Sequence, residues 1–407
     1  MPTDTNLSEP WDVAVVGAGP VGLLLANLLG DQGFRVLVFE QRTDPVASSM
    51  AIGVMPPSLK ILRNIGLDRE LIAHGVRVRL AVVHGGCGLL GRITFDHLPC
   101  DNPFILSVPQ AETVRLLEGK LSKFPSVRLQ RGTEVIGVTN EKHRVGVCLR
   151  DTVTGNESSV WARYLVACDG HKSSIRKLTG MVASEKDYGL SFLMADFDDH
   201  SGLASEAHLF FSACGSVESF PLPGGRRRWI AQTDRLAKEA PDGFLEQLVR
   251  ERSGYDLTGS PKHFQSPFRV KRLLNHRFFD GRIVFCGDAA HVMSPIGGQG
   301  MNTGFADAEY LAGALAVVGR SGESADRVFA EYDRCRRRAF CVASARAARG
   351  MWLGTRTGRL ATRVRDAVLR HVLLRPPLNK ILPAYYAMLT VPNYLSHVSG
   401  TPVNDSA

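Results

Sequence analysis

The chain has 407 residues, of which 44% are hydrophobic and 22% are charged, with a formal net charge of +9. This composition excludes a disordered, fibrous or repeat protein, and the length allows a large core in two or three structural units. No run of about 18 apolar residues is present, so we expect no membrane-spanning helix. The segment MPTDTNLSEP lacks the basic start and apolar run of a signal peptide, which predicts a cytoplasmic protein.

The cysteines are scattered singly, without a CxxC pair or a histidine at zinc-ligand spacing. We therefore expect reduced thiols and no metal site. The eight positions are Cys87, Cys100, Cys148, Cys168, Cys214, Cys286, Cys335 and Cys341.

The positive charge is concentrated in residues 331–375, which contain twelve arginines, no lysine and three acidic residues. We favour a solvated helical face whose arginine stems cover apolar surface. Contact with a membrane or an acidic carrier protein is a weaker alternative. No nucleic-acid motif accompanies the charge, so nucleic acid is not expected as a partner.

The first candidate site follows a predicted buried strand at residues 11–16, WDVAVV. GAGPVG comes next, then a helical segment and a second strand that ends at Glu40, which is the context a GxGxxG turn requires. Gly17 would permit the tight turn, Gly19 the approach of a pyrophosphate, and Gly22 close packing of helix and strand. Glu40 would accept hydrogen bonds from a ribose diol, which argues against NADP here. The motif alone does not distinguish FAD from NAD.

A second motif lies in YLVACDGHKSSIRKLTG. A predicted strand runs from Tyr164 to Cys168 and is followed by Asp169 and Gly170. Taken alone, this segment is at least equally typical of a strand that ends in an Asp–Gly turn before a helix cap.

A third motif fills residues 281–315, GRIVFCGDAAHVMSPIGGQGMNTGFADAEYLAGAL. Its predicted strand ends before Asp288, and a loop rich in proline and glycine leads to a helix that begins near Gly300. Three glycines so close together before a helix would let the backbone approach a flat ligand. The helix N-terminus would favour the negative charge of a reduced flavin.

Together, the three segments resemble the signatures of the class A flavoprotein monooxygenases, the family of para-hydroxybenzoate hydroxylase, phenol hydroxylase and the ubiquinone-pathway hydroxylases. The matches are GxGxxG, DGxxSxxR (Asp169, Gly170, Ser173 and Arg176) and GDAAH…P…GQGxN. The resemblance implies an α/β fold with a Rossmann-type FAD-binding domain, an inserted β-sheet substrate domain and a helical C-terminal region. The implied cofactor-binding residues are Gly17, Gly19, Pro20, Gly22, Glu40, Gln41, Arg42, Gln110, Asp169, Gly170, Gly287, Asp288, Pro295, Gly298, Gly300, Met301 and Asn302.

The same resemblance assigns roles around the flavin. Asp288 would bind the ribityl or ribose region, and Gln110 would touch the FAD chain. The expected catalytic positions are Pro295, over the reactive edge of the isoalloxazine, with Gly297 and Gly298, which frame the ring. His291 is expected to belong to the FAD scaffold rather than to act as an acid or base.

One stretch departs from the family pattern. Many members carry an arginine in the loop after the second strand, where it contacts the flavin or its phosphates. This chain has Ser48, Ser49, Met50 and Ala51 there, and the nearest arginine is Arg42. Flavin positioning is therefore expected to differ.

The domain division implied by the resemblance is a discontinuous FAD-binding domain, a substrate domain and a C-terminal helical region. The FAD-binding domain would comprise residues 9–78, 107–185 and 275–330. The substrate domain would comprise residues 79–106 and 186–274, and the C-terminal helical region residues 331–398. Short β-rich segments within 186–274 predict a sheet over the flavin. The C-terminal region is expected to cap the substrate domain, with lipid contact as the alternative, and its prolines should break any long helix.

Pocket-lining candidates on this sheet are Phe210, Phe211, Phe220, Pro221 and Trp229. A mostly apolar pocket is the general expectation for a small-molecule site. For any one of these residues, however, ordinary sheet core is favoured. His208 is a candidate base, although a lone histidine is more often structural.

The activity implied by the resemblance is an NADPH- or NADH-driven monooxygenase of secondary metabolism. NAD(P)H reduces FAD, molecular oxygen gives a flavin C4a-hydroperoxide, and an oxygen atom passes to an aromatic or alkene substrate by hydroxylation or epoxidation. Two alternatives stay open. One is a flavin-dependent reductase or dehydrogenase, related to geranylgeranyl reductases or halogenases, although the halogenase signature WxWxIP is absent. The other is a non-redox flavin-binding protein.

Overall fold

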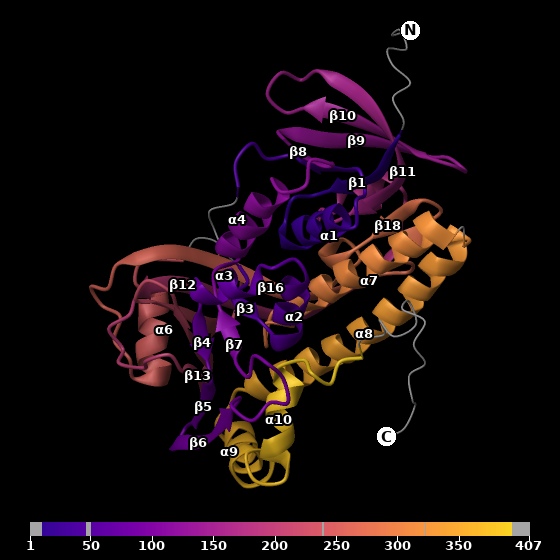
Figure 1. Cartoon of the computed structure of the whole chain (residues 1–407). Helices are drawn as coiled ribbons and strands as arrows, with labels where there is room; N and C mark the ends of the chain where they lie inside the picture. The colour runs from indigo at the N-terminus through magenta and orange to yellow at the C-terminus, as the bar shows by residue number, and fades with distance from the viewer. Residues whose placement is uncertain (1–9, 46–49, 238–239, 322, 393–407) are drawn as a thin grey trace.

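Two eight-stranded sheets and one three-stranded sheet organise residues 10–45, 50–237, 240–321 and 323–392, which the computed structural model describes. In Figure 1 the first sheet lies at the top, the second at the left, and the last helices at the bottom. The long helix α8 (Ala325–Gly354) runs from the first sheet toward the last helices.

The first sheet has a parallel centre made of valine-rich strands. Val13, Ala14 and Val15 in β1 are fully buried, as expected for a parallel strand covered on both faces. Its strands, in spatial order, are β17 (Phe279–Asp280), β18 (Ile283–Phe285), β11 (Glu157–Ala167), β1 (Trp11–Val16), β2 (Val36–Glu40) and β8 (Val127–Arg131), and β10 (Val145–Asp151) joins β11 to β9 (Thr133–Asn140). The expected strand–helix–strand order is confirmed at β1, α1 and β2.

Helices flank this sheet and bring the three motifs together. Pro20 opens α1, where its missing N–H group costs nothing because the first turn has no partner for it. α1 packs against both α7 and α4, and α7 packs against α8. The bounds are α1 (Pro20–Asp31), α4 (Gln110–Leu121), α5 (Ser174–Leu178), the 3-10 turn η1 (Gly287–Ala289) and α7 (Gln299–Ser321).

The second sheet is antiparallel except where β13 pairs with β5. The strands expected within 186–274 are present, but the segment also contains α6 (Phe244–Ser253), which packs on one face of the sheet. The strand order is β19 (His291–Val292), β16 (Lys262–Asn275), β12 (Ala183–Asp198), β15 (Arg226–Thr233), β14 (Gly215–Leu222), β13 (Ala207–Ser212), β5 (Leu80–Gly85) and β6 (Gly88–Thr94).

A small sheet and the last helices complete the described chain. The small sheet has the order β3 (Gly53–Val54), β7 (Ile105–Ser107) and β4 (Val76–Val78), and α2 (Pro56–Asn64) and α3 (Asp68–Ala73) lie near it in the chain. The last helices are α9 (Arg359–Val368), the π-helical turn η2 (Leu369–Leu373) and α10 (Leu378–Tyr386).

The C-terminal helices cover the opposite face of the second sheet. Leu374 and Ala387 are buried in one apolar cluster with Ala81, Val83 and other residues of β5, β6 and β13. α8 begins six residues before the expected boundary at 331. Pro383 lies inside α10, which is only nine residues long and so is not the long helix that the prolines were expected to prevent. α10 tolerates this proline because the helix is short and only one internal hydrogen bond is lost.

Candidate functional site

The glycine-rich turn forms a cradle between β1, β11 and α1. Gly17 has φ +103°, and a Cβ there would lie 2.5 Å from the backbone oxygen of Cys168. A Cβ on Gly22 would lie 2.0 Å from the backbone oxygen of Gly17, so both positions require glycine. At Gly19 a Cβ would meet nothing within 4 Å. This open space lies at the N-terminus of α1 and fits a pyrophosphate.

Glu40 is held in the orientation that a ribose would need. Its Oε2 atom accepts from the backbone N–H of Ala18 at 3.0 Å, and its Oε1 atom accepts from that of Arg42 at 3.0 Å. Gln41 and Arg42 are both exposed beside it. The expected site residues at this edge are therefore together, although no hydrogen bond from a described residue fixes the side chain of Arg42.

Arg228 of β15 reaches the loop that lacks the family's arginine. Ser48 and Ser49 lie outside the described residues, but the backbone oxygen of Met50 accepts from Nη1 of Arg228 at 2.7 Å. Ala51 exchanges hydrogen bonds with Gln110: its N–H donates to Oε1 at 3.3 Å, and its oxygen accepts from the backbone N–H of Gln110 at 3.1 Å. The described end of this loop is thus held by the second sheet and by α4.

Asp169 and Arg176 connect the second motif to the third. The Oδ2 atom of Asp169 accepts from Ser174 Oγ and from the backbone N–H of Ile175, both at 3.1 Å, whereas its Oδ1 atom is buried without a partner among the described residues. Gly170 has φ +79°. Arg176 donates to the backbone oxygen of Ala289 at 3.1 Å, so the two motifs lie against each other.

Asp288 is a free acceptor at the end of β18. No described residue donates a hydrogen bond to it, and the preceding Gly287 turns the chain with φ +60°. The residue keeps solvent access, but partial burial, opposed by His291 and His171, raises the pKa of its carboxyl. A carboxylate in this situation would accept hydrogen bonds from ligand hydroxyl groups, which fits a ribityl chain.

His291 belongs to a buried charge network behind this turn. Its Nε2 atom lies 2.6 Å from Oδ2 of Asp307, and Arg336 Nε donates to the other carboxylate oxygen at 2.7 Å. Burial alone would raise the pKa of Asp307, but His291 and Arg336 outweigh it and the pKa is lowered. Asp307 also accepts from the backbone N–H of Gly287 at 3.3 Å. The network fixes the turn, which agrees with the expected scaffold role of His291.

The loop before α7 contains the two glycines that were expected to frame a flat ligand. Gly297 and Gly298 have φ +85° and φ +65°, and Pro295 is exposed. Asn302 accepts from the backbone N–H of Met55 at 2.8 Å and donates to the oxygens of Gly53 and Gly298 at 2.9 and 2.7 Å.

The remaining positions of this loop lie at the start of α7. Gly300 and Met301 are in its first turn and half-buried. Oε1 of Gln299 is buried without a partner among the described residues. The loop is thus tied firmly to β3 while its glycine backbone stays accessible.

The pocket-lining candidates lie on different faces of the second sheet. Trp229 and Phe210 pack under α6 in one apolar cluster, with Trp229 only 1% exposed. Sheet core therefore describes their surroundings. Phe211 and Phe220 are half-buried on the other face, in the cluster shared with the C-terminal helices. Pro221 is buried, and its backbone oxygen accepts from Ser107 Oγ at 2.6 Å.

His208 also lies on the α6 side. Its Nδ1 atom is 3.0 Å from Nε2 of His84, and its ring stacks with Phe210. Burial, followed by the charges of His84 and Arg227, lowers its pKa to about 4. This location puts the sheet between His208 and the glycine loop before α7, so His208 is not a base at that loop.

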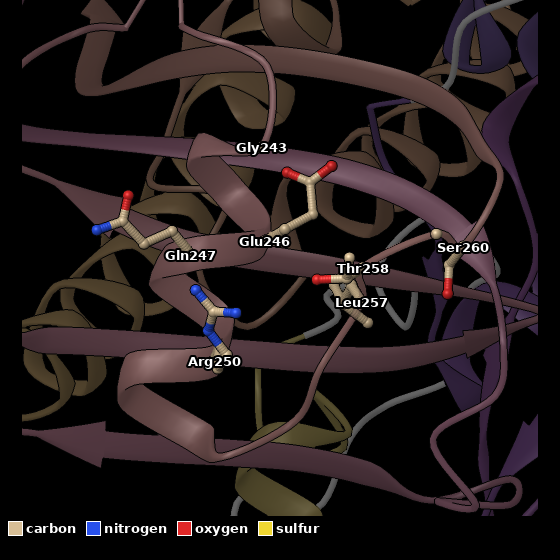
Figure 2. A pocket seen from close by; sticks show the side chains of 8 residues that line it. Gly243, Glu246, Gln247, Arg250, Leu257, Thr258 and Ser260 are labelled. Atoms are coloured by element: carbon tan, nitrogen blue, oxygen red, sulfur yellow. The ribbon is translucent and has the colours of Figure 1, made fainter.

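A surface pocket beside α6 is distinct from the motif site. It has a volume of about 380 Å³ and is lined by Glu246, Gln247 and Arg250 together with the turn at 257–260 (Figure 2). None of the motif residues lines it. Within the described ranges, no cluster of three His, Cys, Asp or Glu side chains could hold a metal ion, and no helix is long and apolar enough to span a membrane.

Comparison with known proteins gives the family. The FAD binding domain family matches residues 10–346. The 6-methylpretetramide 4-monooxygenase of Streptomyces rimosus is 34% identical over 325 residues, which are 76% of this chain and 56% of that protein. The para-nitrophenol 4-monooxygenase of Pseudomonas sp. (strain WBC-3) is 28% identical over 373 residues, which are 87% of this chain and 89% of that protein.

A solved structure agrees with this fold. The anhydrotetracycline hydroxylase OxyS from Streptomyces rimosus superposes with a TM-score of 0.78 at 26% identity, over 98% of this chain and 78% of that chain. The chain spans 56% to 64% of the length of three Streptomyces monooxygenases that it matches. Because the family match covers most of the chain, the protein belongs to the FAD binding domain family, and both its resemblance to the class A flavoprotein monooxygenases and the expected α/β fold are confirmed.

Proposed function

We propose that the protein is an FAD-dependent monooxygenase that uses NADH or NADPH and molecular oxygen to hydroxylate or epoxidise an aromatic or alkene-containing small molecule. The observation that carries this proposal is the position of the glycine loop before α7. Ile296 of this loop packs in one cluster with Ile230 of the second sheet. A flavin held by the loop would therefore face the sheet, where a substrate can meet it.

The cradle residues support FAD as the cofactor. The open space at Gly19, the oriented Glu40 and the free acceptor Asp288 match a dinucleotide pyrophosphate, a ribose diol and a polyol chain. FAD, once reduced, supplies the oxygen chemistry, and the protein supplies position and exclusion of water. The cofactor-binding residues expected from the sequence, with Pro295, Gly297 and Gly298 beside the reactive edge, remain predictions of this assignment.

Related enzymes support an aromatic substrate. Two relatives are named as 4-monooxygenases, one of 6-methylpretetramide and the other of para-nitrophenol. We therefore favour a phenol, either single-ring or polycyclic, over an alkene. The division into an FAD-binding domain, a substrate domain and a C-terminal helical region, and action in the cytoplasm, belong to the same proposal.

The arginine-rich region divides into buried and exposed parts. Arg336 and Arg365 are buried in ion pairs with Asp307 and Asp366. α9, by contrast, exposes Leu360 and Val364 at 78% and 58%, with arginines beside them in the sequence. Contact of this helix with an anionic membrane or an acidic carrier protein stays a prediction, which sedimentation with anionic and neutral lipid vesicles would test.

Turnover with isotopically labelled oxygen tests the proposed function. The FAD-loaded protein would be mixed with NADH or NADPH, a set of phenols and polycyclic phenols, and ¹⁸O₂. A monooxygenase consumes nicotinamide faster with its substrate and places one ¹⁸O atom in the product. Nicotinamide oxidation without a labelled product would indicate a reductase or dehydrogenase. No nicotinamide oxidation would indicate a non-redox flavin-binding protein.

A further inference from the structure

Glu218 stands in the middle of the sheet face that looks toward the flavin loop. It lies on β14 between Leu209 of β13 and Ile230 of β15, which are its direct cross-strand partners. Val217, the preceding residue, packs on the α6 side, so Glu218 points to the opposite face because strand side chains alternate. Ile230 packs with Ile296 and with Met351 of α8.

Side chains on this face keep solvent access although helices cover it. Along β13, β14 and β15 nearly all residues on the α6 side are buried, whereas the other face carries both buried and half-buried residues. Ala207, Ser216, Leu222 and Arg228 are buried there, while the half-buried set consists of Glu218 and the side chains around it, Leu209, Phe211, Phe220, Ile230 and Gln232. Space therefore remains between the sheet and the elements that cover it, and we call this space the chamber.

Glu218 is the acidic residue of this set, and no described residue neutralises it. No hydrogen bond or ion pair reaches its carboxyl from the described part of the chain. The charged pair on the same face, Arg228 and Asp196, is joined by hydrogen bonds of 2.6 and 2.9 Å, and the remaining Nη1 of Arg228 donates to the backbone oxygen of Met50 rather than to Glu218. The titratable group facing Glu218 from α10 is Tyr386, whose pKa is raised by burial and then by the charges of Tyr385 and Glu218.

We propose that Glu218 receives the hydroxyl proton of a phenolic substrate in the chamber and selects neutral donors over aromatic carboxylates. This proposal rests on the proposed function. An acidic side chain without a protein partner needs a donor from the ligand, because an unpaired buried carboxyl is costly. A substrate carboxylate at the same place would meet like charge in a weakly solvated chamber.

The proton transfer is balanced within the enzyme–substrate pair. The phenolic O–H bond breaks, a new O–H bond forms on the Glu218 carboxylate, and the electron pair left on oxygen delocalises into the ring. The ring carbons ortho and para to that oxygen become more electron-rich, which favours attack on an electrophilic oxygen. Burial raises the pKa of Glu218 to about 7, close to that of an effective base at neutral pH.

Three ligands of one shape test the selection directly. 4-Chlorophenol carries the donor, 4-chloroanisole lacks it, and 4-chlorobenzoate carries a negative charge. Dissociation constants would be measured at pH 8 from the change in the absorption spectrum of the FAD-bound protein. We expect the phenol to bind about tenfold or more tightly than the anisole in the wild type, as a charged hydrogen bond predicts. Glu218→Gln should lower this preference severalfold and improve binding of 4-chlorobenzoate.

The pH dependence of turnover adds a second readout. Product formation should rise through pH 7 in the wild type and lose this rise in Glu218→Gln. Glu185→Gln, which removes an exposed carboxyl from β12, is the matched control and should leave both the ligand preferences and the profile unchanged. The gain in benzoate binding is a change that misfolding would not produce.

Two results would overturn the assignment. One is an unchanged phenol preference in Glu218→Gln together with no gain in benzoate binding. The other is a wild-type protein that binds 4-chlorophenol no more tightly than 4-chloroanisole. If ¹⁸O still enters the product in Glu218→Gln with an unchanged pH profile, Glu218 is not the acceptor, yet the monooxygenase function stands. If the wild type incorporates no ¹⁸O from any phenol or polycyclic phenol, the proposed function itself fails.

Discussion

His291 Nε2 lies 2.6 Å from Oδ2 of Asp307, and both side chains are at most 1% exposed. The contact joins the turn after β18 to α7, and Arg336 adds a third element, α8, through the other carboxylate oxygen. Asp307 therefore neutralises a buried arginine and fixes the backbone that carries Asp288. Stability and the position of the turn that carries Asp288 depend on the same carboxylate.

Asp307→Asn should unfold more easily and load less FAD. Removing one partner of a buried ion pair leaves Arg336 uncompensated, which costs about 3 to 5 kcal/mol. Thermal and denaturant unfolding would measure the loss. Glu141→Gln, which removes an exposed pair with Arg144, is the control and should cost less than about 1 kcal/mol. Equal losses of unfolding free energy in the two variants would show that the buried network stabilises the fold no more than an exposed ion pair does.

Gly19→Val and Gly22→Val should fail for different reasons. The valine at position 19 enters open space, so the apoprotein should fold while FAD affinity falls by about tenfold or more, because the side chain occupies the pyrophosphate position. The valine at position 22 collides with the backbone of Gly17 and should lower stability by about 1 to 3 kcal/mol or more. Circular dichroism and flavin content separate the two outcomes, and full FAD loading of Gly19→Val would contradict the cradle.

Asp288→Ala should lose FAD without losing its fold. The substitution removes an acceptor for a ligand hydroxyl, and hydrogen bonds to charged groups contribute about 1.5 to 3 kcal/mol, or about ten- to a hundredfold in affinity. Flavin content and FAD titration of the apoprotein measure the change. Asp280→Ala, which removes an exposed carboxyl at the end of β17, is the control and should load normally. Normal flavin content in Asp288→Ala would remove this residue from the site.

The cradle could be predicted from the sequence because its chemistry is local. Gly17, Gly19 and Gly22 stand within six residues. Backbone geometry requires glycine at positions 17 and 22, and Gly19 leaves the open space between them, so a short motif encodes the whole turn. The strands beside these glycines are buried on both faces. Their continuous apolar runs therefore predicted them as strands. The loop at Gly297 and Gly298 was predictable for the same reason.

Contacts between distant residues could not be predicted in this way. In the sequence, nothing distinguishes Arg336 from the other eleven arginines of residues 331–375. Only the packing of α8 on α7 shows that it pairs with Asp307. The sequence also did not show which face of the second sheet is covered by α6, because this helix lies in a segment that we interpreted as β-rich. Trp229 and Val217 lie on the face that α6 covers, so Glu218, the next residue after Val217, lies on the face of the chamber. Alternation divides strand residues into two faces but does not say which face a ligand meets.

Stability should fall as the pH falls from about 6.5 to about 4 because of His208. Burial keeps its folded-state pKa near 4, below the ordinary value of 6.5, so the unfolded chain takes up the proton first. Its stabilising contribution is complete above pH 6.5 and is lost as the pH falls toward 4, by about 3 kcal/mol at most.

His208→Phe should flatten this part of the pH profile, since the stack with Phe210 and His84 can be kept without a titrating ring. His143→Gln changes an exposed histidine and should leave the profile as it is. Unfolding midpoints at half-unit pH steps give the comparison. A wild-type profile that is level between pH 6.5 and 4 would contradict the buried neutral state of His208.

Arg228 should prove to have two separable roles, one in stability and one in holding the loop at Met50. Arg228→Met leaves Asp196 buried and unpaired, which should cost about 3 to 5 kcal/mol. The double variant Arg228→Met, Asp196→Leu removes both charges and should recover most of that loss. Because it still lacks the donor to the Met50 oxygen, it should bind FAD more weakly than the wild type even though it folds. Unfolding and FAD titration of the single and double variants would be compared. If the double variant recovers its stability and also binds FAD as the wild type does, the loop at Met50 needs no hydrogen bond from the sheet. Arg228 would then not replace the arginine that many relatives carry in the loop itself.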